Sequence, residues 1–270
     1  DIAVAFSGGT DSAFLLAAAL RHCPGKVAAL TVKTPYIQQA VLEETRSLAQ
    51  KLCAEHIIIT LDNISDEIIE NPPDRCYRCK SRLFQHIIDI SKMSGITSVA
   101  DGSNCDDLND YRPGLQAVRE LGVQSPLLEC GFTKRDIRDA SKNWGLDTWD
   151  KAPGTCLLTR LPYNFRIDEE TLRMVEKSES FIAGMGFSNV RVRTMTISEK
   201  DGSNGEKISA KIEVSPEEIG KITENRVFSE ISAFLEKSGY SEVEIDTEGY
   251  FMGKMNKSIN TGGSSKQGRT

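Results

Sequence analysis

The pattern of apolar and polar positions in the first half of the chain predicts strands that alternate with helices. Short apolar runs predict buried strands at residues 3–6, 26–32, 56–61 and 97–101. Helical periodicity between and after these runs predicts helices at residues 13–20, 38–52 and 75–90. This alternation is typical of an α/β fold whose parallel sheet carries helices on both faces.

The pattern changes after a proline-bounded connector at residues 152–163. A helix is predicted at 168–185 and another at 226–238, with strands at 189–197, 207–214 and 242–247 and a polar turn around residues 201–202. These elements predict a smaller C-terminal mixed α/β domain. We therefore expect a first domain at 1–165, a substrate-binding or oligomerisation domain at 166–255, and a disordered tail rich in Gly, Ser and Lys at 256–270.

A glycine-rich loop, Ser-Gly-Gly-Thr-Asp-Ser at residues 7–12, joins the first strand to the first helix. Gly8 and Gly9 allow a ligand to approach the backbone, and the free N–H groups at a helix start attract phosphate. Ser7 and Ser12 add hydroxyls, while Asp11 would repel a phosphate unless a cation such as Mg²⁺ lies between them. The loop lacks the Walker and dinucleotide patterns. It predicts a site for Mg-nucleotide or pyrophosphate, with an ordinary strand-to-helix turn as the alternative.

Composition narrows the class of protein. The chain has 270 residues, a formal net charge of −6 and 39% hydrophobic residues, which indicates a protein of ordinary globular composition. An acidic balance argues against a nucleic-acid partner. No apolar run has the length of a membrane span and no signal-peptide pattern is present, so we expect a cytoplasmic protein without a membrane partner.

Two of the seven cysteines, Cys76 and Cys79, are spaced so that both sulfurs lie on one side of a helix. The pair is compatible with a redox pair, half a zinc site, part of an iron–sulfur site or two inert thiols. Cys156, in the irregular connector, is the natural third ligand. Three cysteines would hold a 4Fe–4S cluster with one iron open to a further ligand such as sulfide. Cys105 and Cys130 carry no such pattern, and the three histidines are interpreted as structural.

Charged side chains in the second domain are less distinctive. Arg191 and Arg193 lie two positions apart on a predicted strand, so their side chains share a face. Such a pair suits capture of phosphate or carboxylate, but it is equally compatible with a solvated strand face. Glu179 and Glu213 are two acids among many.

Taken together, the motifs resemble the LarE family of ATP-dependent sulfur transferases, which has the PP-loop ATP pyrophosphatase (adenine nucleotide alpha hydrolase-like) fold. The resemblance covers residues 1 to about 255. It rests on residues 7–12 (SGGTDS), 74–80 (DRCYRCK), 101–107 (DGSNCDD), 110–114 (DYRPG), 149–151 (WDK) and 155–163 (TCLLTRLPY), with Gly249 and Tyr250 near its end. It implies an enzyme of nickel-pincer cofactor biosynthesis that adenylates and thiolates the carboxylates of pyridinium-3,5-biscarboxylic acid mononucleotide.

The resemblance also implies roles for individual residues. The family has one subtype that sacrifices the sulfur of a cysteine matching Cys156 and another that holds a 4Fe–4S cluster on three cysteines. Because Cys76 and Cys79 accompany Cys156, we expect the cluster subtype. Further residues are assigned to the nucleotide, with Mg²⁺ on Asp11, and to the substrate: Ser7, Gly8, Gly9, Asp11, Ser12, Asp101, Arg112 and Lys134 to ATP, and Glu179, Arg191, Arg193 and Glu213 to the substrate.

Two other functions share part of this pattern. A PP-loop tRNA thiolase could use the same loop and a three-cysteine cluster, although the acidic charge and the lack of an evident RNA-binding module argue against it. A zinc- or redox-regulated nucleotide-binding protein without catalysis is the third hypothesis. We further expect a homo-oligomer that accepts sulfur from sulfide or a sulfur donor.

Overall fold

The computed structural model describes residues 1–109, 113–152, 154–197 and 207–251. It divides into two compact units, Asp1–Cys156 and Leu157–Thr270, a division nearer the N-terminus than the boundary expected near residue 166. The expected tail at 256–270 and the polar turn around residue 201 lie outside the described residues. Within the described ranges, each helix is too short or too polar to cross a membrane.

The first unit is built on a four-stranded parallel sheet with strand order β3-β2-β1-β4. This sheet confirms the predicted fold class, although the fourth strand is shorter than expected because only two of its residues pair. The strands are β1 (Ile2–Ala5), β2 (Val27–Lys33), β3 (Glu55–Thr60) and β4 (Val99–Ala100).

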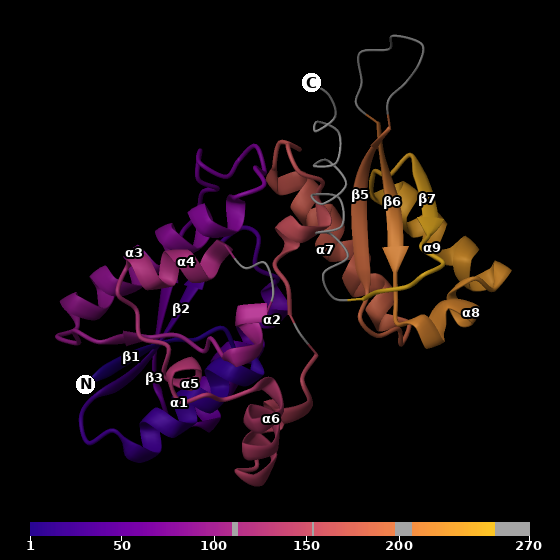
Figure 1. Ribbon diagram of the computed structural model, residues 1–270. Coiled ribbons are helices and arrows are strands. Elements are labelled where there is room, and N and C mark those ends of the chain that lie inside the picture. Colours follow the sequence, from indigo (N-terminus) through magenta and orange to yellow (C-terminus); the bar gives the residue numbers. More distant parts are fainter. Residues whose placement is uncertain (110–112, 153, 198–206, 252–270) are drawn as a thin grey trace, which may run out of the picture. The chain divides into compact units, whose positions relative to one another are not determined.

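Helices cover both faces of this sheet (Figure 1). They are α1 (Thr10–His22), α2 (Gln39–Lys51), α3 (Arg75–Met93), α4 (Pro113–Glu120), α5 (Pro126–Glu129) and α6 (Lys134–Asn143), with short 3₁₀ turns η1 (Cys105–Asn109) and η2 (Asp147–Asp150). Thr133 and Asp136 form a capping box at the start of α6.

The alternation of side chains along the strands explains why helices pack on both faces of the sheet. Val4 and Ala29 belong to one buried cluster with residues of α1, α2 and α6, while Ala3 and Leu30 belong to a second cluster with residues of α3 and α4. Successive residues of a strand point to opposite sides, and both sides here are apolar. The buried strands and their helices thus hold the strand ends, and the loops that leave them, in fixed positions.

The second unit has a three-stranded mixed sheet with order β5-β6-β7, in which β5 and β6 are antiparallel and β6 and β7 parallel. Helices α7 and α9 pack against it through an apolar cluster that includes Ile182, Ile212 and Leu235. The elements are η3 (Leu157–Arg160), α7 (Glu169–Gly184), β5 (Arg191–Ile197), β6 (Lys207–Glu213), η4 (Pro216–Glu218), α8 (Ile219–Ile222), α9 (Asn225–Ser238) and β7 (Glu242–Ile245).

His56 ties β3 to β2, which predicts a dependence of stability on pH. The Thr31 hydroxyl donates to the Phe6 carbonyl at 2.6 Å, so His56 Nε2–H is the donor in its 2.8 Å contact with Thr31 Oγ1. Burial, followed by the charge of Arg46, lowers the pKa of His56 from 6.5. The unfolded chain therefore takes up the proton first as pH falls.

We expect the free energy of unfolding to fall as pH is lowered through about 6.5, because the folded state disfavours the charged imidazole. Urea unfolding of the wild-type chain and of His56→Gln between about pH 7.5 and 5 measures this effect. The His56→Gln variant should show the smaller pH dependence; equal slopes would contradict the assignment.

Candidate active site

The loop of residues 7–12 leaves β1 and enters α1 at the carboxyl end of the sheet. Its own hydroxyls close it: Ser7 N–H donates to Ser12 Oγ at 3.3 Å, and Ser12 Oγ donates to the Gly9 carbonyl at 3.2 Å. Gly8 has φ +69°, and a Cβ there would lie 2.5 Å from Thr45 Oγ1. Only glycine fits both demands, so the backbone of this loop is held in the compact form that suits phosphate.

Asp11 lies in the first turn of α1 and forms an ion pair with Lys134 through its Oδ2 atom. Its Oδ1 atom is buried and has no hydrogen-bond partner among the described residues. Buried carboxylate oxygens are normally satisfied, and an oxygen left in this state is suited to a cation. The chemistry of this donor fits Mg²⁺, which prefers one or two carboxylates together with phosphate oxygens.

Asp101, assigned to ATP from the sequence, is buried at the end of β4. Its carboxylate accepts hydrogen bonds from Ser103 Oγ at 2.5 Å and Ser125 Oγ at 2.7 Å. These bonds hold the following residue, Gly102, against the phosphate loop, where a Cβ would lie 2.9 Å from Ser12 N. Asp101 therefore supports the backbone beside α1.

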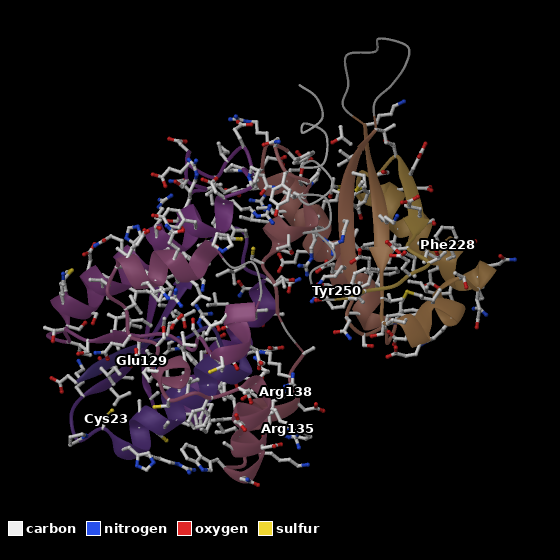
Figure 2. All side chains as sticks on the ribbon, in the orientation of Figure 1. Cys23, Glu129, Arg135, Arg138, Phe228 and Tyr250 are labelled. Carbon is white, nitrogen blue, oxygen red and sulfur yellow. The ribbon has the colours of Figure 1, made fainter. Side chains whose placement is uncertain are left out.

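Lys151 connects the loop to the connector that carries Cys156. Its ammonium donates to the Gly8 carbonyl at 3.0 Å and to Glu44 Oε2 at 2.7 Å. Arg138, which comes from α6 (Figure 2), donates to the Lys151 carbonyl at 3.0 Å. Gly8, Glu44 and Lys151 also border an open cavity of about 620 Å³. Gly8 thus belongs both to the loop and to the lining of the cavity, and the hydrogen bonds of Lys151 hold this part of the backbone in place.

The three predicted cysteine ligands interact with one another within the first unit. Cys76 and Cys79 lie in the first two turns of α3. The pKa of each is raised by Cys156, which places the three sulfur groups within electrostatic reach. Tyr36, a buried residue after β2, contacts Cys79 through its hydroxyl, with 3.2 Å between Tyr36 Oη and Cys79 Sγ.

Desolvation is the largest influence on the pKa of Tyr36, Cys76 and Cys79. Burial raises the pKa of Cys79 to about 12, and the neighbouring thiols of Cys156 and Cys76 raise it as well, against the lowering effects of the Tyr36 hydrogen bond and of Lys80. Burial also raises the pKa of Tyr36 above its ordinary value. For Cys76, desolvation and Cys156 raise the pKa while Arg75 and Lys80 lower it. Metal binding here would release protons, because the ligand is the thiolate.

The donor set fits an iron–sulfur cluster in its chemistry. Among the described residues, no group of three or more His, Cys, Asp or Glu side chains converges on a single ion. In a 4Fe–4S cluster each thiolate binds a different iron, so the sulfurs that hold a cluster surround it without meeting at one point. The fit lies in the chemistry of the donors: three thiols are the ligands that such a cluster needs, and Arg75 and Lys80 favour the thiolate form of Cys76.

In the second unit, the predicted substrate residues take part in a buried charge network. Arg193 Nε donates to Glu213 Oε1 at 2.7 Å, across the β5–β6 pair. Glu179 receives two hydrogen bonds from Arg160, at 2.7 and 3.0 Å, and one from the Val192 N–H at 3.0 Å. This part of β5 is therefore no solvated strand face.

Arg191 is also buried. Its guanidinium lies over the ring of Tyr250, 4.8 Å from the centroid, and Figure 2 labels Tyr250 in this unit. The structure thus places the four predicted substrate residues in one unit with Arg160, to which the sequence analysis assigned no role: Glu179, Arg191, Arg193 and Glu213.

The Arg160–Glu179 pair predicts a large loss of stability on substitution. Both side chains are nearly inaccessible, at 1% and 6% exposure. Arg160→Met would leave the Glu179 charge buried without this partner, and we expect a loss of about 3–5 kcal/mol in the free energy of unfolding. Urea unfolding measures it. Arg173→Met is the control: it removes an exposed pair with Glu169 and should change stability by less than about 1 kcal/mol.

Sequence reasoning missed three residues that hold the first unit's site together. Tyr36 follows the carboxyl end of β2. Ligand-binding residues gather at the carboxyl ends of strands in such sheets, so this position could have marked Tyr36 as a site residue. Lys151 belongs to a string singled out for the resemblance but received no role. Thr45, whose hydroxyl and Cβ face Gly8, carries no sequence signal beyond its place in a helix. Arg112, predicted to contact pyrophosphate, lies outside the described residues.

The fold and the loop together define the class of protein: an α/β protein of the PP-loop type with a smaller C-terminal domain. No protein-family model matches the chain. It is 32% identical over 261 residues to the pyridinium-3,5-bisthiocarboxylic acid mononucleotide synthase of Lactiplantibacillus plantarum, covering 96% of this chain and 90% of that protein. The chain therefore belongs to the LarE family of sulfur transferases, and it is an enzyme of the sulfurtransferase type.

Two further relatives carry no assigned function. An uncharacterised protein of Synechocystis is 33% identical over 255 residues, which is 94% of this chain and 91% of that protein. An uncharacterised protein of Methanocaldococcus jannaschii is 34% identical over 192 residues, covering 71% of this chain and 73% of the relative.

Proposed function

We propose that the chain is an ATP-dependent sulfur transferase that adenylates and thiolates the carboxylates of pyridinium-3,5-biscarboxylic acid mononucleotide, with sulfide carried on a 4Fe–4S cluster. The similarity to the Lactiplantibacillus synthase supports the substrate class. What supports the rest is that Cys76, Cys79 and Cys156 all belong to the unit that holds the phosphate loop and interact electrostatically with one another. The proposal thus assigns to that unit both the activation of the acceptor and the supply of sulfur.

The first half-reaction uses the loop and Asp11. The N–H groups at the start of α1 bind the β- and γ-phosphates. Asp11 would hold Mg²⁺, and the charges of this ion and of the Lys134 ammonium would offset the negative charge of the phosphates. A substrate carboxylate oxygen attacks the α-phosphorus, the bond to the β-phosphate breaks, and pyrophosphate leaves. Lys134 is paired with Asp11 and would have to exchange this partner for a phosphate when Mg²⁺ binds Asp11.

The second half-reaction replaces oxygen by sulfur. A sulfur nucleophile attacks the carbonyl carbon of the acyl-adenylate, and AMP leaves with the original carboxylate oxygen. The cluster, when bound by Cys76, Cys79 and Cys156, would supply sulfide from the iron that no cysteine occupies. The three thiols must lose their protons to hold it, a change that Arg75 and Lys80 favour for Cys76.

Substrate-dependent release of AMP tests the first half of this proposal. The anaerobic protein is incubated with ATP, Mg²⁺ and either the biscarboxylate nucleotide or bulk tRNA, and AMP is quantified by chromatography. AMP formation that depends on the biscarboxylate supports the proposed substrate. AMP formation that depends on tRNA would favour a tRNA thiolase, and the absence of both would favour a nucleotide-binding protein without this chemistry.

A second measurement separates the two possible sulfur sources. If Cys156 gives up its own sulfur, the intact mass of the protein decreases after one turnover and Cys156 becomes dehydroalanine. If sulfide comes from a cluster, Cys156 keeps its mass. Peptide mass spectrometry after a single turnover distinguishes these outcomes, and loss of the Cys156 sulfur would contradict the cluster proposal.

A further inference from the structure

We infer that Tyr36 is a positioning residue of the sulfur-transfer site, whose phenol hydroxyl donates a hydrogen bond to the Cys79 sulfur and thereby raises the reduction potential of the bound cluster. This inference rests on the proposed function, since it assumes that Cys79 is a cluster ligand.

The position of Tyr36 follows from the fold. It comes shortly after β2 in the sequence, in the turn before α2, while Cys79 lies in α3. Tyr36 is only 6% exposed, and 3.2 Å separates its Oη atom from Cys79 Sγ. Tyr36 also interacts electrostatically with Cys156. The ring therefore brings one hydroxyl to the cysteine group from a part of the chain 43 residues away.

The direction of the hydrogen bond is set by the ligand. A thiol and a phenol can each donate, but a sulfur that binds iron is a thiolate and has no proton. Tyr36 must then be the donor and Cys79 Sγ the acceptor. The bond also occupies one direction around the sulfur, which restricts the rotation of the Cys79 side chain.

A donated hydrogen bond changes the electronic properties of the ligand. It withdraws electron density from the sulfur and stabilises the reduced, more negative cluster, so hydrogen bonds to ligand sulfurs are one of the means by which proteins set cluster potentials. Because Tyr36 is buried, water has little access from its side to replace the hydroxyl. Removing the hydroxyl should therefore shift the potential to a more negative value.

The matched control is another tyrosine of the same region. Tyr77 lies between the two cysteines on α3, but its hydroxyl donates to Glu120 at 2.5 Å. Tyr36→Phe and Tyr77→Phe remove the same atom, and only the first removes a hydrogen bond to sulfur. Tyr77→Phe therefore controls for the loss of a phenol hydroxyl on the helix that carries the two cysteines.

The experiment uses the full chain, reconstituted anaerobically with iron and sulfide. Iron content is measured first, and the reduction potential follows from a redox titration monitored by electron paramagnetic resonance. We expect equal iron in all three proteins, a more negative potential with an altered spectrum for Tyr36→Phe, and wild-type values for Tyr77→Phe.

Each contrary result has its own meaning. Equal potentials in wild type and Tyr36→Phe would overturn the inference and leave the proposed function intact. Loss of iron uptake by Tyr36→Phe alone would assign the hydroxyl to assembly of the site and would also overturn it. A wild-type chain that takes up no cluster would refute the cluster in the proposed function, and the inference with it.

Discussion

Replacing Asp11 with alanine is expected to lower the rate of AMP formation by at least about 100-fold, the size of effect seen when one electrostatic contact to a reacting group is lost. Asp11 has a buried Oδ1 atom without a partner among the described residues, and this atom is our candidate for the Mg²⁺ ligand. Without it, the charges of the leaving pyrophosphate are not neutralised. The rate is measured with ATP, Mg²⁺ and the biscarboxylate nucleotide.

The same variant should retain its iron, because Asp11 does not belong to the cysteine group. Asp139→Ala is the control: this exposed carboxylate on α6 pairs with Arg135 and should leave both properties unchanged. Normal AMP formation by Asp11→Ala would remove Asp11 from the mechanism. Loss of both iron and AMP formation would show that adenylation and the sulfur site are not separable as proposed.

Replacing Cys79 with alanine is expected to have the opposite effect. Removing one of three ligands should abolish retention of iron and sulfide, since the cluster would lose the ligand to one of its irons. AMP formation should continue, because the loop at residues 7–12 has its own hydrogen bonds. Iron and sulfide analysis after anaerobic reconstitution measures the first property, and AMP release the second.

Cys130→Ala provides the matched control, because Cys130 is exposed and follows a different helix, α5. It should keep the cluster. If Cys130→Ala loses iron while Cys156→Ala retains it, the third ligand has been assigned to the wrong cysteine. If Cys79→Ala keeps a full complement of iron, Cys79 is no ligand.

Much of the fold of the first unit could be predicted from sequence because its signals are local. Buried parallel strands are continuous apolar runs, whereas the strand order β3-β2-β1-β4 was not predicted. The capping box at Thr133 and Asp136 is another local feature, since its two residues lie three apart in the sequence. The fourth strand was predicted too long, because only Val99 and Ala100 pair before the chain turns toward Asp101.

The site could be predicted only in part, because its remaining contacts join distant segments. Gly8 and Gly9 are recognisable from one short motif, whereas the contact of Tyr36 with Cys79 and that of Lys151 with Gly8 span 43 and 143 residues. The periodicity of apolar residues carries no information about contacts between residues so far apart in the sequence. The buried partner of Glu179 was missed for the same reason: Arg160 lies in an irregular connector whose burial becomes evident only in three dimensions.

Mass spectrometry of the substrate tests the central claim most directly. The biscarboxylate nucleotide is incubated anaerobically with the reconstituted protein, ATP, Mg²⁺ and sulfide, and the small molecules are analysed over time. We predict that the nucleotide gains the mass difference between sulfur and oxygen at a carboxylate, with one AMP formed per exchange. An unchanged nucleotide in the presence of a protein that holds its cluster and binds ATP would contradict the account.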